Sequence, residues 1–296
     1  MSPLDHAVRT LSALGIHDPA EVTELTGGVA NTVCLVRRPG HDDVVLKSTE
    51  GVPGGIYRAE AESLDVLRDL GGLRTPHVLS AGPSWLLLEA LVPTPPPEPA
   101  FWERAGRAVA ALHDVRGERF GWQHDGWLGL LPQHNRWDED GHRFFAEQRV
   151  LRYVGEPRAE AVLTAADRAA LERLCTRLPE LVPSAPPALT HGDLWHNNVA
   201  ATADGEPAFL DPAVSWTWPE VDLSMMYRTG HAPARFFDAY TEVRPLADGW
   251  RERMPVLHVR QLLCILAQHG DQWNALDDLR AVLRPFRTNR PEVRKG

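Results

Sequence analysis

The chain has 296 residues, of which 43% are hydrophobic and 24% charged, and its formal net charge is −9. This composition is ordinary for a globular enzyme and excludes a largely disordered chain. The acidic balance argues against nucleic-acid binding, which needs basic surface to neutralise phosphates. The N-terminus does not resemble a signal peptide, and no run approaches the roughly 20 apolar residues of a membrane helix. We therefore expect a cytoplasmic monomer that binds neither nucleic acid nor membrane.

The N-terminal part of the chain predicts a small lobe rich in strands. Residues 1–20 carry apolar side chains at helical spacing and predict a short helix. Apolar runs then predict strands at residues 21–25, 32–37 and 44–47. Gly27, Gly28 and Asn31 lie between the first two strands, where a turn with exposed backbone N–H groups would receive nucleotide phosphates. A plain hairpin turn is the alternative, because glycines between strands often only reverse the chain.

A basic and an acidic residue of this lobe are predicted to form an ion pair. Lys47 ends an otherwise apolar strand, and residues 56–70 predict a helix. Glu60 lies on the same face of that helix as Leu64 and Leu67, so its carboxylate needs a buried partner. A Lys–Glu pair of this kind anchors the α- and β-phosphates of ATP in kinases. A solvated lysine at a strand end is the simpler alternative.

A proline-rich connector predicts the boundary between two lobes. Residues 85–91 indicate a buried strand, whereas residues 93–99 contain five prolines and can form neither a helix nor a central strand. Helical spacing dominates the chain after this connector. The fold class is therefore predicted as α+β, with three parts: a nucleotide-binding lobe over residues 1–88, a hinge and linker over 89–99, and a helical lobe with the catalytic and acceptor-binding residues over 100–296.

The strongest chemical signal lies between residues 189 and 211. Asp193 and Asn198 are five residues apart, and Asp211 follows thirteen residues later, after an apolar run. Kinase catalytic loops place a base and a metal-binding Asn at this spacing, and a metal-binding Asp ends the next strand. Oxygen ligands of these types suit Mg²⁺. The pattern predicts Asp193 as the catalytic base, and Asn198 and Asp211 as ligands of Mg²⁺.

Histidines and tryptophans surround this segment. His191 and His196 are five residues apart, but two histidines without a third ligand are weak support for a metal site. We expect a structural role for His191 and an exposed or acceptor-facing position for His196. Trp195, Trp216 and Trp218 are candidates to line a pocket for a flat or cationic acceptor. Packing in the core is the alternative for each indole.

These motifs resemble those of the fructosamine kinase family. Residues 191–198 are similar to the family's HGDLWxGN motif, and residues 211–222 are similar to its DPAxxxGxRExDL segment. Shorter matches follow the family's order at residues 110–113, 120–121, 127–129, 132–135, 144–149, 236–240 and 245–250. The resemblance extends from about residue 27 to residue 268, and the motifs are shared with the aminoglycoside phosphotransferases.

The resemblance implies a protein-kinase-like two-lobed fold and transfer of the ATP γ-phosphate, with Mg²⁺, to a hydroxyl of a small molecule. In that family the acceptor is a ketosamine, and a related sugar amine would fit the same chemistry. Carried over by position, Lys47 and Glu60 hold ATP, Glu89 and Leu91 lie at the adenine hinge, and Asp193 is the base.

The acceptor side of the sequence departs from the family pattern. The catalytic loop has His196-Asn197 in place of Ser-Gly, and residues 217–219 replace Gly-His-Arg. These changes keep a second hypothesis open, namely a phosphotransferase acting on an aminoglycoside or a cationic peptide antibiotic. A third hypothesis is a nucleotide-binding pseudokinase. Pseudokinases typically lose the lysine, the base or a metal ligand, and this sequence has all of them.

Overall fold

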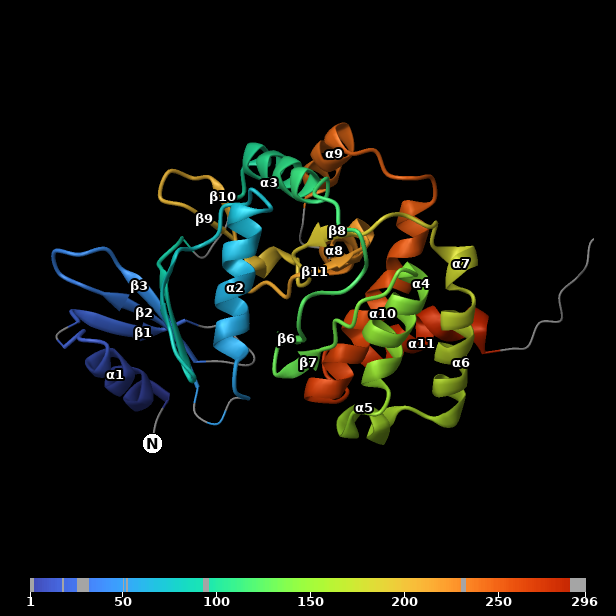
Figure 1. Ribbon diagram of the computed structural model, residues 1–296, viewed down its shortest axis with the longest axis horizontal. Coiled ribbons are helices and arrows are strands. Elements are labelled where there is room, and N and C mark those ends of the chain that lie inside the picture. Colours follow the sequence, from blue (N-terminus) through green and yellow to red (C-terminus); the bar gives the residue numbers. More distant parts are fainter. Residues whose placement is uncertain are drawn as a thin grey trace, which may run out of the picture.

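The chain folds into two lobes of unequal size, shown in the computed structural model of Figure 1. The structure describes residues 3–17, 19–25, 32–49, 51, 53–92, 96–229 and 233–287. A β-sheet with helices α1 (Pro3–Ala13) and α2 (Ile56–Asp69) forms the smaller lobe, and helices dominate the larger one. This is the predicted order of a β-rich lobe followed by a helical lobe. Within the described ranges, no helix has the length and apolar character needed to span a membrane.

The small lobe is an antiparallel sheet with strand order β1-β2-β3-β5-β4. Its strands are β1 (Glu21–Glu24), β2 (Thr32–Arg37), β3 (Val44–Ser48), β4 (Val78–Ala81) and β5 (Trp85–Glu89). Side chains of a strand alternate between the two faces of the sheet. Val44 and Leu46 of β3 pack with Leu11 of α1, whereas Val45 packs on the opposite face against α2. Lys47 shares the face of Val45, so the alternation points its ammonium toward α2.

The larger lobe is built around one extended apolar core, through which α10 runs. Its helices are α3 (Pro99–Leu112), α4 (Gly141–Phe144), α5 (Pro157–Val162), α6 (Ala165–Thr176), α7 (Leu178–Leu181), α8 (Pro219–Thr229), α9 (Ala234–Val243), α10 (Trp250–His269) and α11 (Ala275–Leu283). A π-helical segment at Phe145–Val150 continues α4, and 3₁₀ turns lie at Leu151–Tyr153, His196–Asn198 and Arg284–Phe286. Helix α10 packs against α5, α8 and α11.

Three short antiparallel strand pairs lie among the helices of the described part of this lobe. They are β6 (Gly126–Leu128) with β7 (Leu131–Gln133), β8 (Ala188–Thr190) with β11 (Ser215–Thr217), and β9 (Val199–Ala201) with β10 (Pro207–Phe209). The interlobe connector joins this system, because Val92 and Ala201 exchange backbone hydrogen bonds of 2.8 and 3.0 Å. The segment after the small sheet is thereby tied to the β9–β10 hairpin.

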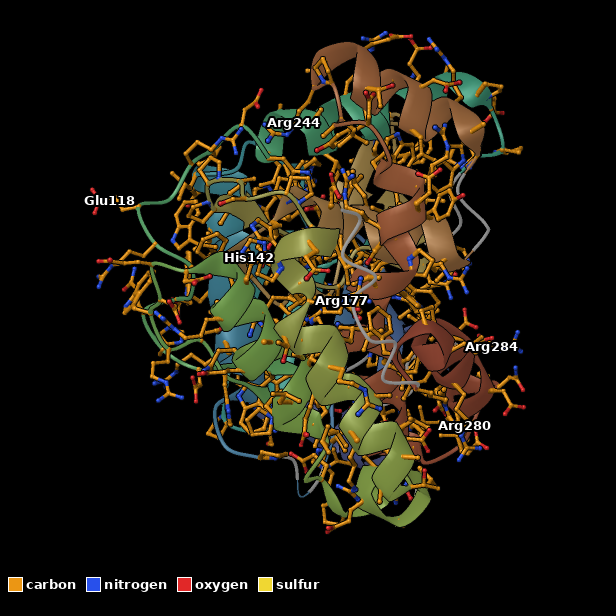
Figure 2. All side chains as sticks on the ribbon, turned by 90° about the vertical axis from the view of Figure 1, so that its right-hand side faces the viewer. Glu118, His142, Arg177, Arg244, Arg280 and Arg284 are labelled. Atoms are coloured by element: carbon orange, nitrogen blue, oxygen red, sulfur yellow. The ribbon has the colours of Figure 1, made fainter. Side chains whose placement is uncertain are left out.

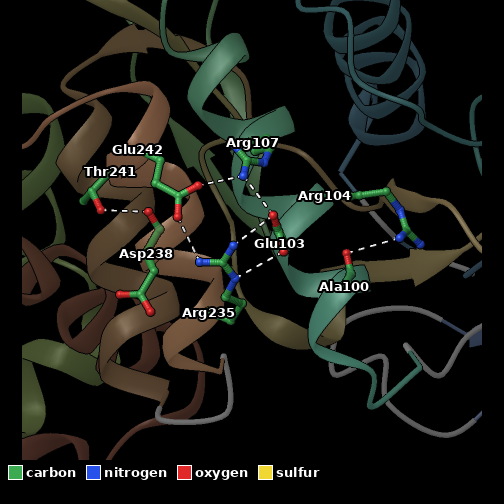
Figure 3. Close-up of polar contacts among 8 residues, drawn as sticks. All are labelled: Ala100, Glu103, Arg104, Arg107, Arg235, Asp238, Thr241 and Glu242. Atoms are coloured by element: carbon green, nitrogen blue, oxygen red, sulfur yellow. Dashed lines mark hydrogen bonds and ion pairs between the residues drawn. The ribbon is translucent and has the colours of Figure 1, made fainter.

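Four ion pairs between two arginines and two glutamates lie at the contact of α3 and α9, drawn in Figure 3. Arg107 lies 2.8 Å from Glu103 and 2.6 Å from Glu242, and Arg235 lies 2.9 Å from each of the same two carboxylates. Such exposed pairs contribute little stability individually. The helices approach closely at Gly106, where a Cβ atom would lie 2.2 Å from a backbone oxygen of α9. The glycine therefore permits the contact, and the ion pairs fix its register.

The last described helix is anchored to α6 by a buried carboxylate. Asp167 forms a capping box with Thr164 at the start of α6. The same carboxylate pairs with Arg280, at 3.2 Å, and with Arg287. Figure 2 shows this end of the helical lobe, with Arg280 and Arg284 at its edge. Because a buried charge is costly without partners, these contacts fix the C-terminal segment against the lobe.

Candidate active site

The predicted ion pair of the small lobe is present. Lys47 Nζ lies 2.6 Å from Glu60 Oε1 on α2, and the lysine side chain is only 7% exposed. The same ammonium contacts Asp211 Oδ1 of the helical lobe. Burial alone disfavours the charged ammonium, but the carboxylates of Asp211 and Glu60 outweigh burial and raise the pKa of Lys47. Lys47 is therefore a permanent cation at the junction of the lobes.

Helix α8 holds the loop that carries Asp193 through the side chain of Asp222. Two backbone N–H groups donate to the buried carboxylate of Asp222, from His191 at 2.7 Å and from Gly192 at 2.8 Å. The imidazole of His113 lies 3.2 Å from the same carboxylate. Burial would raise the pKa of Asp222, but the hydrogen bonds from His113 and the loop outweigh it and lower that pKa. Asp222 thus anchors the loop as an anion.

A glycine is required at one position of this loop. Gly192 has a φ of +83°, and a Cβ atom there would lie 1.9 Å from the backbone oxygen of Ala213. Ala213 in turn donates its N–H to the oxygen of His191, at 2.8 Å. The loop before Asp193 therefore packs backbone against backbone on the segment after Asp211, and no larger residue fits between them.

A hairpin explains the spacing between Asn198 and Asp211. Strands β9 and β10 pair Val199 with Phe209, and the ladder continues with a hydrogen bond of 2.9 Å from Leu210 N to Asn198 O. Asn198 and Asp211 therefore emerge side by side at the open end of the hairpin. Asp211 adopts a φ of +53°, a strained conformation for a residue with a side chain and one that is often found at functional sites.

Asp193 lies between these two residues and the acceptor side. The amide nitrogen of Asn198 donates to the backbone oxygen of Asp193, at 2.8 Å, and approaches its Oδ2 at 3.3 Å. The other carboxylate oxygen, Oδ1, is buried and has no hydrogen-bond partner among the described residues. Burial raises the pKa of Asp193 to about 7, and the positive charge of Arg260 opposes that shift. A carboxylate poised near neutral pH suits a general base.

These residues converge on one cleft of about 580 Å³ between the lobes. Six predicted site residues line it: Lys47, Glu60, Asp193, Trp195, Asn198 and Asp211. The donor set fits Mg²⁺, because it offers the Asp211 carboxylate and the amide oxygen of Asn198, whose nitrogen is already engaged with Asp193. No cluster of three or more His, Cys, Asp or Glu occurs in the described chain, so a zinc-type site is not indicated there.

The predicted nucleotide residues outside this group have different positions. Gly27, Gly28 and Asn31 lie outside the described residues. Glu89 ends β5 at the connector, where its carboxylate pairs with Arg74 at 2.5 Å and accepts the N–H of His77 at 3.0 Å. Leu91, in the connector, is half-buried. The role of Glu89 and Leu91 at the adenine hinge therefore stays a prediction. At Glu89 the backbone would have to bind the adenine, because the carboxylate already pairs with Arg74 and His77.

Two of the four predicted acceptor residues lie at the catalytic loop. Trp195 lines the cleft, and its ring meets that of His196 edge-on, at 5.3 Å between centroids. His196 begins the 3₁₀ turn that leads to Asn198 and is not among the residues that line the cleft. His191 is fully buried, and burial lowers its pKa, which agrees with the structural role expected for it.

The positions of Trp216 and Trp218 correct the prediction that they line the acceptor pocket. Trp218 is 3% exposed and packs in the helical core with Phe120 and Phe145, at centroid distances of 5.9 and 5.7 Å. Trp216 pairs with β8 and lies behind Trp122, at 5.7 Å. Neither indole reaches the cleft. The alternative of core packing therefore holds for both, because partners distant in sequence surround them.

Other tryptophans line the cleft instead. Trp122 and Trp127 border it near β6, and Trp273 borders it in the turn between α10 and α11. Trp127 belongs to a stretch that resembles the family, so its motif offered a signal. Trp273 is a lone indole after a helix, and nothing in the sequence distinguishes it from an ordinary surface residue.

Three features define a phosphotransferase of the protein-kinase-like fold. They are a buried lysine–glutamate pair, a partly buried carboxyl group whose pKa is near 7, and an Asn–Asp pair on one hairpin. The model of the fructosamine kinase family matches residues 7–281. A Synechocystis protein named "Probable ketoamine kinase" is 33% identical over 249 residues, covering 82% of this chain and 83% of that protein. The chain belongs to the fructosamine kinase family and is an ATP-dependent small-molecule kinase.

Solved structures agree with this assignment. A Thermobifida fusca protein provisionally named a fructosamine-3-kinase superposes with a TM-score of 0.80 at 33% identity, covering 94% of this chain and 98% of that one. A choline kinase from Streptococcus pneumoniae superposes with a TM-score of 0.64 at 12% identity, covering 96% and 99%. The second similarity shows the fold alone, which is the predicted protein-kinase-like, two-lobed α+β fold.

Proposed function

We propose that this kinase transfers the γ-phosphate of ATP to a hydroxyl of a ketosamine or a closely related sugar amine. The observation that carries the proposal is the meeting of Lys47, Asp193, Asn198 and Asp211 in one cleft, in a chain of the fructosamine kinase family. Relatives in that family carry the names "Probable ketoamine kinase" and "fructosamine-3-kinase", and a ketosamine is an acceptor of the kind these names describe. The proposal includes a cytoplasmic location, where ATP is abundant.

Each catalytic residue of the cleft has a separate role in phosphoryl transfer. Lys47, held by Glu60, offers its ammonium to the α- and β-phosphates of ATP. Asp193 orients the acceptor hydroxyl and takes its proton as the oxygen attacks the γ-phosphorus. The bond between the γ-phosphorus and the β–γ bridging oxygen then breaks, and ADP leaves with that oxygen. The protein supplies chiefly position and charge, as in other phosphoryl transfers.

Asn198 and Asp211 are the residues that would hold Mg²⁺ at the phosphates. When bound, the ion would neutralise the charge that develops on the transferred group. The hairpin sets the two ligands side by side, and the contact of Asp211 with Lys47 sets that carboxylate toward the phosphate-binding ammonium.

An acceptor panel tests the proposal. The purified chain is incubated with ATP and Mg²⁺ and with one candidate at a time: N-methyl fructosamine, free fructose, choline, kanamycin and a cationic peptide antibiotic. ADP release is measured, and the phosphorylated product is identified by mass. We expect turnover of the ketosamine above all other candidates. Turnover of an antibiotic, with no turnover of the ketosamine, would replace the proposal by the hypothesis of an antibiotic phosphotransferase. If the protein neither hydrolyses ATP nor transfers phosphate to any candidate, a pseudokinase would be favoured.

A further inference from the structure

The wall of the cleft formed by α10 and the turn after it, called the far wall, has no acidic or basic side chain other than histidine among the described residues that line the cleft. Helix α10 contributes Gln261, Ile265 and Gln268 to this wall, and the turn after α10 contributes Trp273. Indole faces and amide side chains recognise flat, neutral groups through apolar contact and hydrogen bonds.

Among the described residues that line the cleft, negative charge is confined to the predicted catalytic, nucleotide and metal residues. Among the described residues that line it, the acidic ones are Glu60, Asp193 and Asp211, and two of these contact Lys47. The two histidines of α10 that line the cleft add no charge at neutral pH, whereas His124, on the β6 side, pairs with Glu62 at 2.9 Å and has a raised pKa. Burial lowers the pKa of His258 to about 3, with help from nearby arginines, and burial also lowers the pKa of His269. A second cationic group on the acceptor would therefore find no carboxylate on this wall.

Trp273 is held at the rim of the cleft by an unusual turn. Its side chain is 60% exposed, although a large apolar surface is normally covered. Trp273 and Asn274 both have left-handed backbones, with φ of +52° and +62°, a combination that costs conformational energy. The ring stands edge-on to His269, at 5.2 Å between centroids. The turn thus fixes an exposed indole beside the entrance of the acceptor site.

We propose that the preferred acceptor is a ketosamine whose nitrogen carries a neutral aromatic substituent, and that Trp273 binds this ring at the rim of the cleft. The inference rests on the proposed function and specifies its substrate class. The sugar would lie toward Asp193, and the ring would lie toward the far wall, against Trp273. Trp273 is then a specificity-determining residue without a part in phosphoryl transfer.

Two ketosamines that differ only in the nitrogen substituent test the inference: N-benzyl fructosamine and N-methyl fructosamine. Steady-state kcat/KM is measured for both with saturating ATP and Mg²⁺. Aromatic contacts are worth about 0.5–1.5 kcal/mol beyond area burial, so Trp273→Ala should lower kcat/KM for the benzyl compound by about 2- to 12-fold. The same variant should leave the methyl compound within about twofold, and Trp273→Phe should retain part of the benzyl preference.

Trp137→Ala is the matched control. Trp137 is also a partly exposed indole, at 36%, but it lies against Arg119 and does not line the cleft. The control should change neither substrate's kcat/KM. Equal kcat/KM for the two ketosamines, or an equal loss for both in Trp273→Ala, would overturn the inference and leave the proposed function standing. If wild-type protein phosphorylates neither compound, the proposed function and the inference fall together.

Discussion

The ammonium of Lys47 touches the carboxylate of Asp211, although the two residues are 164 positions apart and belong to different lobes. One cation therefore organises both halves of the site, since Lys47 also pairs with Glu60 on α2. The contact sets the predicted phosphate ligand beside the predicted metal ligand. It also makes the two lobes depend on one another for charge balance.

Lys47→Met should raise KM for ATP and lower kcat, because the phosphates lose their cation. It should also destabilise the protein, since removing one partner of a buried pair costs about 3–5 kcal/mol, and Glu60 is only 13% exposed in its side chain. Kinetics and thermal unfolding measure the two effects. The double variant Lys47→Met/Glu60→Gln removes the unpaired carboxylate and should regain stability without activity. An unchanged KM for ATP would remove Lys47 from the nucleotide site.

Asp211→Asn should weaken nucleotide binding mainly when Mg²⁺ is present. Asparagine tolerates the left-handed backbone found at this position, so the substitution removes the charge without adding strain. A lost charge-assisted contact is worth about 1.5–3 kcal/mol, or roughly 10- to 100-fold in affinity. Calorimetric titration of ATP with Mg²⁺ and with EDTA separates the two conditions. An equal loss under both conditions would contradict the assignment of Asp211 as a metal ligand.

Asp193→Asn should abolish most turnover while ATP binding stays close to normal. A positioned base typically contributes about 10²- to 10⁴-fold, and the carboxylate makes no contact with Lys47 or Glu60 among the described ion pairs. Single-turnover rates and ATP titration on the same preparation give both quantities. Activity within a few-fold of wild type would mean that another group accepts the proton.

The positions of Lys47, Glu60, Asn198 and Asp211 were predictable because local rules determine them. Strand alternation turns Lys47 toward the next helix, and helical spacing turns Glu60 back toward the sheet. The twelve residues between Asn198 and Asp211 are the length of a hairpin that returns the chain to its starting point. Such patterns depend on residues that are close in sequence, so a single sequence is enough to find them.

The acceptor side was not predictable in the same way. Trp218 lies beside the catalytic segments in sequence, yet Phe120 and Phe145, which enclose it, come from elsewhere in the chain. Trp273 reaches the cleft only because a turn after α10 has a left-handed backbone. Both outcomes depend on contacts distant in sequence, and proximity to a motif did not reveal them.

Asp222→Asn should lower both stability and activity, because the loop of Asp193 loses the anion that accepts its backbone N–H groups. The pKa of Asp222 is lowered in the folded protein, so its contribution to stability is present above the unfolded pKa, about 4, and is lost as pH falls through the folded value. The difference in Tm between wild type and variant should therefore be large at neutral pH and shrink in acid.

Asp167→Asn is the control for this effect. Asp167 is likewise buried with a lowered pKa, but it anchors α6 and the C-terminal segment instead of the catalytic loop. It should show the same acid dependence of the Tm difference, with kcat unchanged. If Asp222→Asn also leaves kcat unchanged, Asp222 supports the fold and does not position the loop.

Trp218→Ala should destabilise the protein without a specific effect on the acceptor. The indole is 3% exposed, lies 5.0 Å from the ring of His142, which Figure 2 labels, and donates from Nε1 to the oxygen of Ala185 at 3.3 Å. Truncation of a buried Trp leaves a cavity and costs about 3–5 kcal/mol. Thermal unfolding should show a large fall in Tm, and Trp218→Phe should recover part of it.

Acceptor kinetics distinguish packing from binding at Trp218. Below its lowered Tm, the Trp218→Ala variant should keep the wild-type KM for the acceptor, because the ring does not line the cleft. Trp137→Ala, at an indole that is 36% exposed, should change the free energy of unfolding by about 0.5 kcal/mol or less. A raised acceptor KM in Trp218→Ala, with Tm close to wild type, would restore the acceptor role that the sequence suggested. The buried position of the ring, enclosed by aromatic partners on several sides, is the reason to expect the opposite.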